Sequence, residues 1–213
     1  MLKIYGRANS INVRKVLWLC EEIGLPFAQE DWGRGYQSTS DAEFQRLSPI
    51  GLVPVIDDDG FVLRESNTIV RYLAATYARA KGAADLYAED LKARATIEAW
   101  MDWAATDVFA GLRPVYLGLY VKTPEFVGKS EIIDWARGAW TRQMRNLDAE
   151  FATSGSPYIA GDRFTIADIP VGLAVNRWFG VEFEKPELPA VARYYERLSE
   201  RPGYRLYGRN GTP

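Results

Sequence analysis

Two polar side chains, Ser10 and Asn12, stand between an apolar segment at residues 2–5 and a helical pattern that begins at Val13. The segment at 2–5 is typical of a short buried strand. A hydroxyl and an amide at such a junction can each donate a hydrogen bond to a molecule bound beside the helix. The alternative is structural, because Asn12 is also a good N-cap for a helix that starts at Val13.

A second polar junction, Glu65-Ser66, lies where an expected strand at 61–63 meets an expected helix at 65–80. Ser66 suits an N-cap, and the free N–H groups behind it can bind an anion. The carboxylate of Glu65 can receive an ammonium group at the same place. Simple capping of the helix explains the same residues without any ligand, so both interpretations stay open.

The third feature is Val53-Pro54, inside an otherwise apolar strand pattern at 52–56. Because proline cannot donate a ladder hydrogen bond, it belongs on an edge strand or at a bulge. The other option is a cis peptide bond, which turns backbone groups outward at the start of a strand. These residues alone do not decide between the two.

A fourth motif, from Phe164 to Ile169, has a structural interpretation only. Thr165 as N-cap and Asp168 three residues later resemble a capping box, with Phe164 and Ile169 placed to form a hydrophobic staple. The motif sets where a buried helix begins, and we assign it no chemistry.

The chain of 213 residues contains no histidine and one cysteine, Cys20. Catalysis by Ser-His-Asp or Cys-His groups and histidine-ligated zinc or haem sites are therefore excluded within one chain. A single cysteine allows no intrachain disulfide, which fits a reducing compartment such as the cytoplasm. Because Cys20 falls within the first helical pattern, we expect a buried small hydrophobe and not a nucleophile.

The elements that must position these side chains follow two different patterns. Residues 1–80 alternate between strand and helix signals and predict a small α/β sheet, and residues 81–87 predict a polar linker. Residues 88–213 lose the strand signals and predict an all-helical domain. Its long helical stretches lie at 88–109 and 125–151, with a break at 111–114 and a helix start at Pro124.

Two further expectations concern partners. The sequence has no apolar leader at its first residues and no run of about 18 apolar residues, so we expect neither export nor a membrane span. The net charge of −2 argues against nucleic acid as the main partner.

Four segments, taken in this order, resemble those of the cytosolic glutathione transferases: SINVRKVLWLCEEIGLPF, SPIGLVPVI, ESNTIVRYLA and AGDRFTIADI. The resemblance covers nearly the whole chain and is closest to bacterial members of the serine or asparagine type. It implies a thioredoxin-like glutathione-binding domain at 1–80 and an all-helical domain at 88–213 that lines the electrophile pocket. It also implies glutathione as co-substrate, no metal, a homodimer and a role in detoxification.

By this resemblance Pro54 is a cis-proline, and the backbone of Val53 pairs with the cysteinyl part of glutathione. Glu65 faces the γ-glutamyl ammonium group, and Ser66 faces the γ-glutamyl carboxylate. The glycyl carboxylate needs a donor from the 33–40 loop, where the candidates are Arg34 and Gln37. Ser10 is the first candidate for the donor that stabilises the thiolate, and Asn12 is the next.

The second substrate, an electrophile, needs an apolar and aromatic pocket. Candidates from the helical half are Trp103, Phe109, Tyr116, Tyr120 and Trp178, although each of these aromatics also suits a core position. Arg113 would favour acidic electrophiles.

The sequence therefore predicts a glutathione transferase that acts on a small electrophile, with halogenated compounds among the options. Two alternatives share the fold. One is a non-catalytic glutathione-binding or scaffold protein, and the other is a glutathione-dependent dehalogenase or peroxidase.

Overall fold

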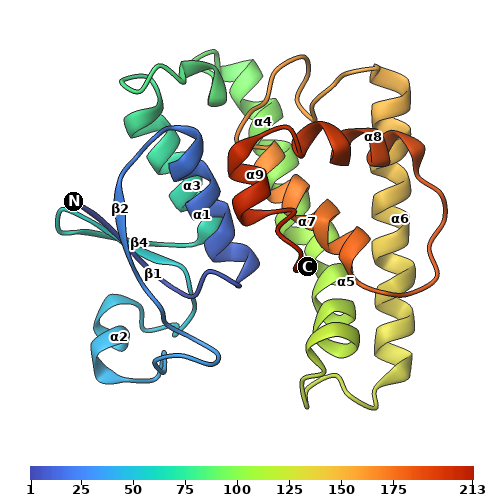
Figure 1. The fold of residues 1–213 in the computed structure, drawn as a ribbon, viewed down its shortest axis with the longest axis horizontal. Helices are drawn as coiled ribbons and strands as arrows, with labels where there is room; N and C mark the ends of the chain where they lie inside the picture. Colours follow the sequence, from blue (N-terminus) through green and yellow to red (C-terminus); the bar gives the residue numbers. More distant parts are fainter. The chain divides into compact units, whose positions relative to one another are not determined.

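The computed structural model describes residues 1–213, and the chain forms two compact units, Met1–Ala88 and Glu89–Pro213 (Figure 1). The first unit holds a sheet with helices, and the second is built from helices alone. The fold class predicted from the sequence, a thioredoxin-like sheet domain followed by an all-helical domain, is confirmed.

The sheet of the first unit has four strands in the order β2-β1-β3-β4. The central strand β1 pairs in parallel with β2 and antiparallel with β3, and β3 pairs antiparallel with β4. The strands of the unit are β1 (Leu2–Tyr5), β2 (Phe27–Glu30), β3 (Val55–Asp58) and β4 (Phe61–Arg64). Its helices are α1 (Ile11–Glu22), α2 (Ala42–Leu47) and α3 (Ser66–Leu73), which continues as a π-helical turn at Ala74–Ala78.

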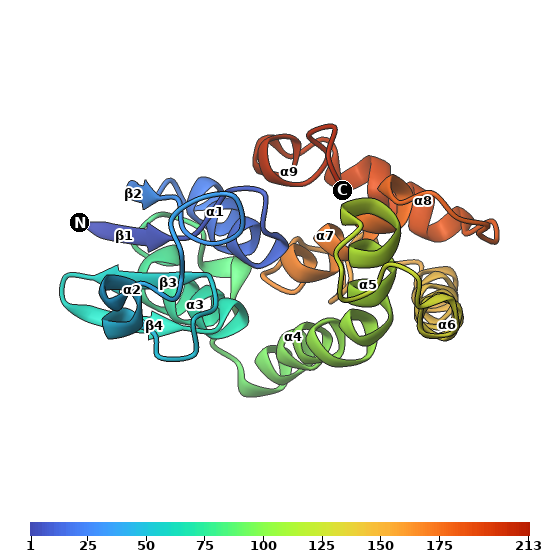
Figure 2. The same cartoon turned by 90° about the horizontal axis from the view of Figure 1, so that it is seen from below.

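Both faces of the central strand β1 are buried at its C-terminal end. Neighbouring residues of a strand point to opposite faces, and Ile4 and Tyr5 of β1 are both buried. On one face Tyr5 packs with Trp32 and with Phe44 of α2. Helices α1 and α3 contact each other (Figures 1 and 2), and α1 is buried over most of its length.

The start of α1 differs from the sequence prediction. The helix begins at Ile11 and not at Val13, because the extended residue Ser10 already accepts the first helical hydrogen bond from the Arg14 N–H at 2.9 Å. Ser10 therefore occupies the N-cap position, and the prediction of Asn12 as N-cap is wrong.

The predicted starts of α3 and β3 also shift by one or more residues. Glu65, with φ of 70°, precedes α3 as its N-cap, so Ser66 is the first helical residue and not the cap. Strand β3 begins at Val55 and not at Leu52, so Pro54 lies just before the strand. The Val53–Pro54 peptide bond is cis, as the family resemblance implies.

The second unit contains helices α4 (Leu91–Trp103), α5 (Phe109–Val115), α6 (Ser130–Ser154), α7 (Asp168–Gly180), α8 (Pro189–Leu198) and α9 (Pro202–Tyr207). Two π-helical turns, at Ala104–Val108 and Tyr116–Val121, flank α5. Helices α5 and α6 pack closely together, since a Cβ atom on Gly111 would lie 2.6 Å from the Trp140 backbone nitrogen.

Two expectations for this unit are wrong. Residues 111–114 do not interrupt the helical structure, because α5 runs through Pro114. Gly111, Leu112 and Val115 of this helix are buried. Packing of this buried side outweighs the hydrogen bond that proline cannot make. Pro124 does not start a helix either, since α6 begins at Ser130.

The capping hydrogen bonds predicted for Thr165 and Asp168 are present, although α7 itself begins at Asp168 with Ala167 as its N-cap, two residues later than predicted. The Asp168 carboxylate accepts the Thr165 N–H at 2.8 Å, and the Thr165 hydroxyl accepts the Ala167 N–H at 3.3 Å. Both residues are buried at the start of α7. None of the helices combines the length and the apolar character that a membrane crossing requires.

Candidate functional site

A small pocket in the first unit gathers five of the residues that the sequence singled out. Five predicted residues line it: Asn12, Val53, Pro54, Glu65 and Ser66. They come from the first turn of α1, the loop before β3 and the start of α3. Residues that lie far apart in the chain therefore meet at one end of the sheet.

The chain reaches this end of the sheet through a glycine. Gly6, with φ of 147°, follows β1 directly. A Cβ atom there would lie 2.6 Å from a methyl carbon of Val13 and 3.0 Å from the Cβ of Val53. Only glycine lets the backbone after β1 pass this close to both α1 and the Val53 loop.

At the start of α3, hydrogen-bond donors (the Ser66 hydroxyl and the first N–H groups of the helix) lie next to an acceptor, the Glu65 carboxylate. Glu65 lies in the left-handed region and is exposed, and its carbonyl accepts the Ile69 N–H at 2.8 Å. Ser66 is buried and lines the pocket. The N–H groups of a first helical turn have no partner within the helix and attract anions. An anion beside Ser66 and a cation beside Glu65 would both be stabilised here.

Ser10 does not line this pocket, although it is only two positions from Asn12, which does. Its side chain makes no capping hydrogen bond to α1, and the residue is partly exposed. The hydroxyl is therefore not used to stabilise the helix start. Asn12, in the first turn of α1, is also partly exposed and does line the pocket.

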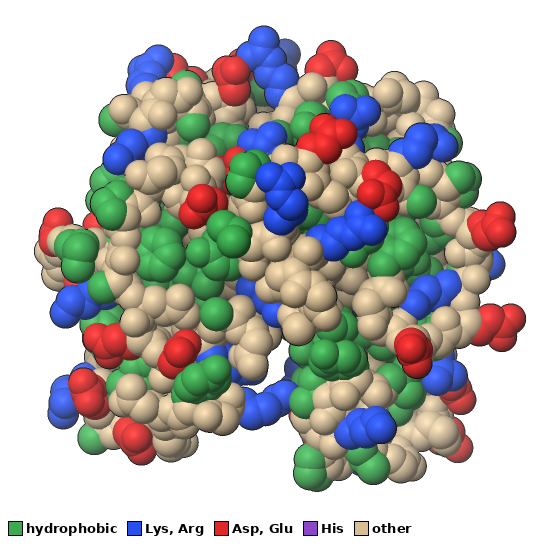
Figure 3. Space-filling view, in the orientation of Figure 1, with side chains coloured by type: hydrophobic (Ala, Val, Ile, Leu, Met, Phe, Trp, Pro, Cys, Tyr) green, Lys and Arg blue, Asp and Glu red, His purple; other side chains and the backbone are tan.

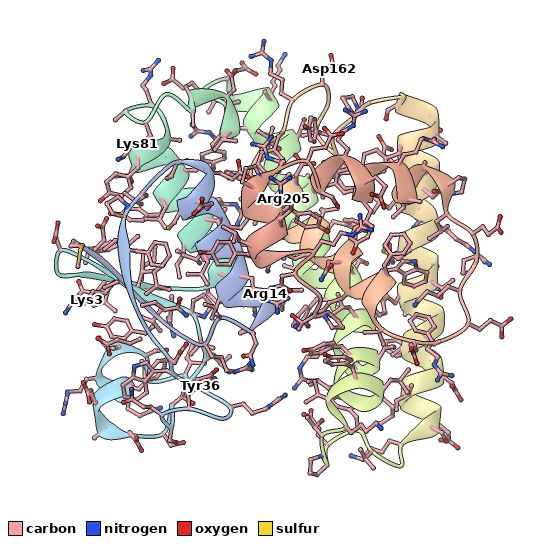
Figure 4. All side chains as sticks on the ribbon, in the orientation of Figure 1. Lys3, Arg14, Tyr36, Lys81, Asp162 and Arg205 are labelled. Atoms are coloured by element: carbon pink, nitrogen blue, oxygen red, sulfur yellow. The ribbon has the colours of Figure 1, made fainter.

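No residue of the loop at 33–40 lines the pocket. Arg34 and Gln37 are both exposed, and neither lies among the residues that line the pocket. The carbonyl of Gln37 accepts the Gly33 N–H at 2.8 Å, which closes the loop on itself. Tyr36, on the same loop and labelled in Figure 4, is exposed as well.

The predicted residues of the second unit have several different surroundings. Trp103 donates a hydrogen bond to Gln143 at 3.1 Å, and Phe109 is partly exposed. The exposed Arg113 forms an ion pair with Glu125 at 3.2 Å, so its charge is already partnered.

Tyr116 and Tyr120 lie one turn apart and stack with their ring centres 5.4 Å apart. The Arg177 guanidinium lies 3.5 Å from the centre of the Tyr116 ring. Trp178, by contrast, is only 1% exposed and packs edge-on against Trp140 and Phe183. The structure places Trp178 in the core of the helical unit, so the expectation that it lines an open pocket is wrong.

Two residues of the first unit, Cys20 and Tyr5, carry ionisable groups whose pKa is raised by burial. Cys20 is buried in α1, and burial raises the pKa of its thiol to about 12. Its interpretation as a buried small hydrophobe is confirmed. Burial and the nearby Glu30 raise the pKa of the Tyr5 hydroxyl, which lies within β1.

Comparison with known proteins decides the family. Residues 4–81 match the family model described as glutathione S-transferase, N-terminal domain, and residues 115–202 match the corresponding C-terminal domain. Glutathione S-transferase GstB of Escherichia coli is 37% identical over 207 residues, which is 96% of each chain. The chain belongs to the glutathione S-transferase family.

Solved glutathione S-transferases agree with this assignment. The theta class enzyme of Xanthomonas axonopodis pv. citri with glutathione bound is 37% identical, with a TM-score of 0.87 over 97% of this chain and 96% of that one. Elongation factor 1-gamma 2 of rice is 30% identical over 96% of this chain, which spans only 47% of the rice protein. The family, the class of enzyme and glutathione as co-substrate, all predicted from the sequence, are confirmed.

Within this glutathione S-transferase, the pocket also contains residues that sequence reasoning missed: Ser48, Ile50, Leu52 and Arg64. Three of them belong to the segment SPIGLVPVI, and Arg64 directly precedes Glu65. The flanks of the two recognised motifs were therefore the signal that could have found them. Ser48 is buried, which is unusual for a serine in a loop.

Proposed function

We propose that this protein activates the thiol of glutathione and transfers the tripeptide to a small electrophile through its sulfur atom. The observation that supports the proposal best is the pocket of the first unit, which collects Asn12, Val53, Pro54, Glu65 and Ser66. These side chains and backbone groups suit a ligand that carries a peptide bond, an ammonium group and a carboxylate close together.

Each end of glutathione then has a partner. The backbone of Val53 pairs with the cysteinyl residue, which fixes the position of the sulfur. The carboxylate of Glu65 binds the γ-glutamyl ammonium group, and Ser66 with the first N–H groups of α3 binds the γ-glutamyl carboxylate. Arg34 and Gln37, on the exposed loop at 33–40, are the donors proposed for the glycyl carboxylate.

Activation of the thiol requires a modest amount of free energy. A thiol with an unperturbed pKa of about 8.5 is only about 3% ionised at pH 7. Lowering that pKa by roughly 2 units costs about 2.7 kcal/mol and makes about three quarters of the thiol reactive. One hydrogen bond to a charged group contributes about 1.5–3 kcal/mol, so a single donor near the N-terminus of α1 suffices.

Ser10 is the proposed donor, because its hydroxyl is partly exposed and makes no capping hydrogen bond. Asn12 is the second candidate, since it lines the pocket. The thiol proton leaves to solvent, and the thiolate attacks an electrophilic carbon. A carbon–sulfur bond forms while the bond to the leaving group breaks, and the leaving group departs with that electron pair.

The helical unit supplies the proposed walls for the electrophile. Phe109 and Tyr116 are partly exposed, and Arg113 and Tyr120 are exposed on the same stretch of chain. Trp103 is partly exposed on the preceding helix. Aromatic walls fit apolar compounds with a good leaving group, and detoxification of such compounds is the proposed role. Dehalogenation and peroxide reduction use the same thiolate and differ in the second substrate.

A homodimer in the cytoplasm is the proposed state. Strand β4 is an edge strand, and its side chains Phe61 and Val62 are 50% and 41% exposed. An apolar edge of this kind is usually covered by a partner. Glutathione is mostly reduced in the cytoplasm, where its thiol is available. Figure 3 shows acidic and basic side chains mixed over the visible face, which offers no continuous basic surface for nucleic acid.

A titration of bound glutathione tests the proposed function. The ultraviolet absorbance of the thiolate is followed against pH with the purified protein in excess. A bound-thiol pKa near 6–7, well below the free value of about 8.5, is the expected result. Saturable binding with an unshifted pKa would favour the scaffold alternative, for which the similarity to elongation factor 1-gamma 2 is the supporting observation. Absence of saturable binding would contradict both.

A further inference from the structure

A buried ammonium group lies directly beside Ser66. Lys15, in the second turn of α1, is only 6% exposed, and its Nζ donates a hydrogen bond to the Ser66 hydroxyl oxygen at 3.3 Å. Ser66 is 8% exposed. Full burial is rare for lysine, because removing an ammonium group from water is costly unless an oppositely charged or polar partner is provided.

The position of this charge is unusual for helix stability. The N-terminus of a helix carries a partial positive charge and is stabilised by anions, whereas cations stabilise the C-terminus. Lys15 places a cation next to Ser66, the first residue of α3, which directly follows the acidic N-cap Glu65. The ammonium group and the helix N-terminus therefore attract the same kind of ligand, an anion beside Ser66.

The hydrogen bond also constrains the Ser66 hydroxyl. An ammonium group can only donate, whereas a hydroxyl donates once and accepts at its lone pairs. Because Lys15 uses an acceptor position of the Ser66 oxygen, the single hydroxyl proton of Ser66 must point elsewhere. The hydroxyl is thereby oriented as a donor toward an acceptor such as a carboxylate oxygen.

We propose that Lys15 is a positioning residue for the γ-glutamyl carboxylate of glutathione. Its charge strengthens the attraction of this carboxylate to the start of α3, and its hydrogen bond orients the Ser66 hydroxyl toward it. The proposal rests on the proposed function, since it assigns a further residue to the same pocket. Lys15 lies within the segment SINVRKVLWLCEEIGLPF, where no role was predicted for it.

Two ligands test this role on four proteins, and Ser66→Ala is added to two of them, the wild type and Lys15→Met. The ligands are glutathione and 4-aminobutyryl-cysteinyl-glycine, which keeps the ammonium group but lacks the γ-glutamyl carboxylate. The proteins are the wild type, Lys15→Met, Lys15→Arg and the matched control Lys3→Met, which removes an exposed lysine of the same unit (Figure 4). Dissociation constants are measured by calorimetry, and folding of each variant is checked by circular dichroism.

The wild type should prefer glutathione over the analogue by about tenfold or more, as expected for a charge-assisted contact. Lys15→Met should weaken glutathione binding about tenfold and leave the affinity for the analogue unchanged, so that the preference disappears. Lys15→Arg should restore most of the preference, and Lys3→Met should behave as the wild type. Ser66→Ala should cost less affinity in the Lys15→Met background than in the wild type, because the two residues act on one carboxylate.

The outcomes separate this inference from the proposed function. If the wild type binds glutathione and Lys15→Met keeps the full preference, the role of Lys15 is overturned and the proposed function stands. Equal weakening of both ligands, or unfolding of both Lys15 variants, would assign Lys15 to packing and overturn the inference. If the wild type binds neither ligand, the proposed function itself fails.

Discussion

The hydroxyl of Tyr194 donates a hydrogen bond to the carboxylate of Asp168 at 2.9 Å, inside the helical unit where both side chains are buried. Asp168 also accepts the Thr165 N–H at 2.8 Å and the Ile159 N–H at 3.0 Å. One carboxylate therefore joins the loop before α7, the first turn of α7 and helix α8. Burial raises the pKa of Asp168 from 3.8 to about 6, and these donors oppose that rise.

The stability of the protein should therefore depend on pH through Asp168. Because its folded-state pKa is raised, the associated stability is fully present below about pH 4 and is lost as the pH rises through about 6. The difference in free energy of unfolding between wild type and Asp168→Asn should fall by about 3 kcal/mol across this window. Urea unfolding at a series of pH values measures it.

The partner residue provides a second variant for this measurement. Tyr194→Phe removes a donor that lowers the pKa of Asp168, so the pH-dependent loss should move to higher pH. A wild-type protein whose stability runs parallel to that of Asp168→Asn from pH 4 to 7 would contradict the expected role of burial.

The choice between Ser10 and Asn12 can be decided by the pKa of bound glutathione. If Ser10 is the donor, Ser10→Ala should raise this pKa by about 1–2 units, because the thiolate loses a hydrogen bond worth about 1.5–3 kcal/mol. Asn12→Ala should then leave it nearly unchanged. The reverse result would transfer the role to Asn12, and the ultraviolet titration of each variant distinguishes them.

Two helical glycines should respond to alanine in opposite directions. Gly111→Ala places a methyl group 2.6 Å from the Trp140 backbone nitrogen and 2.9 Å from the Ala136 carbonyl oxygen. Backbone atoms cannot yield as a flexible side chain does, so we expect destabilisation by about 2 kcal/mol. Gly138→Ala in α6 meets no atom within 4 Å and should stabilise the protein by about 0.5–1 kcal/mol.

Chemical denaturation of both variants beside the wild type measures the two values. Equal effects would mean that α5 and α6 separate enough to accept the extra methyl group at Gly111.

The single thiol of the chain should be unreactive in the folded protein. Cys20 is buried, and its pKa is raised to about 12, so almost no thiolate exists at neutral pH. Ellman's reagent should release no chromophore from the native protein and one equivalent after denaturation in guanidinium. Stoichiometric labelling of the native protein would show that α1 opens readily.

The proposed homodimer can be tested at the edge strand β4. The double variant Phe61→Glu, Val62→Glu places two charges on the exposed apolar side chains and should convert a dimer into a monomer. Trp135→Glu is a matched control, because it adds the same kind of charge at an aromatic side chain of α6 that is 63% exposed. Light scattering after size-exclusion chromatography gives the mass of each species, and dimers of the β4 variant would exclude this interface.

The sequence was most informative where several local signals agree. Thr165 and Asp168 combine a capping pair with flanking apolar residues, and the structure reproduces their contacts. Strand β1 and the burial of Cys20 were predicted for the same reason, because the apolar pattern of the sequence at these residues matches their packing in the structure. Boundaries were less accurate, because the extended Ser10 and the left-handed Glu65 are set by backbone angles that side-chain types do not fix.

The remaining differences between the sequence predictions and the structure come from tertiary packing. Pro114 and Gly111 have low helix propensity, yet both lie within α5, where contact with α6 outweighs that tendency. Lys15 escaped notice because the contact with Ser66 joins residues 51 positions apart. The burial of Trp178 could not be separated from a pocket position by sequence, since both environments favour an aromatic residue.

The unused hydroxyl at the start of α1 bears on attempts to engineer this protein. A serine that caps its helix contributes about 1 kcal/mol to stability, and Ser10 makes no such hydrogen bond. Thermostabilising redesign commonly improves helix caps of this kind. At position 10 a better cap would occupy the same N–H groups of α1 that the proposed chemistry uses to hold a thiolate. Heat tolerance and catalytic rate would then compete for a single helix end, so a more robust variant is better sought at Gly138 than at Ser10.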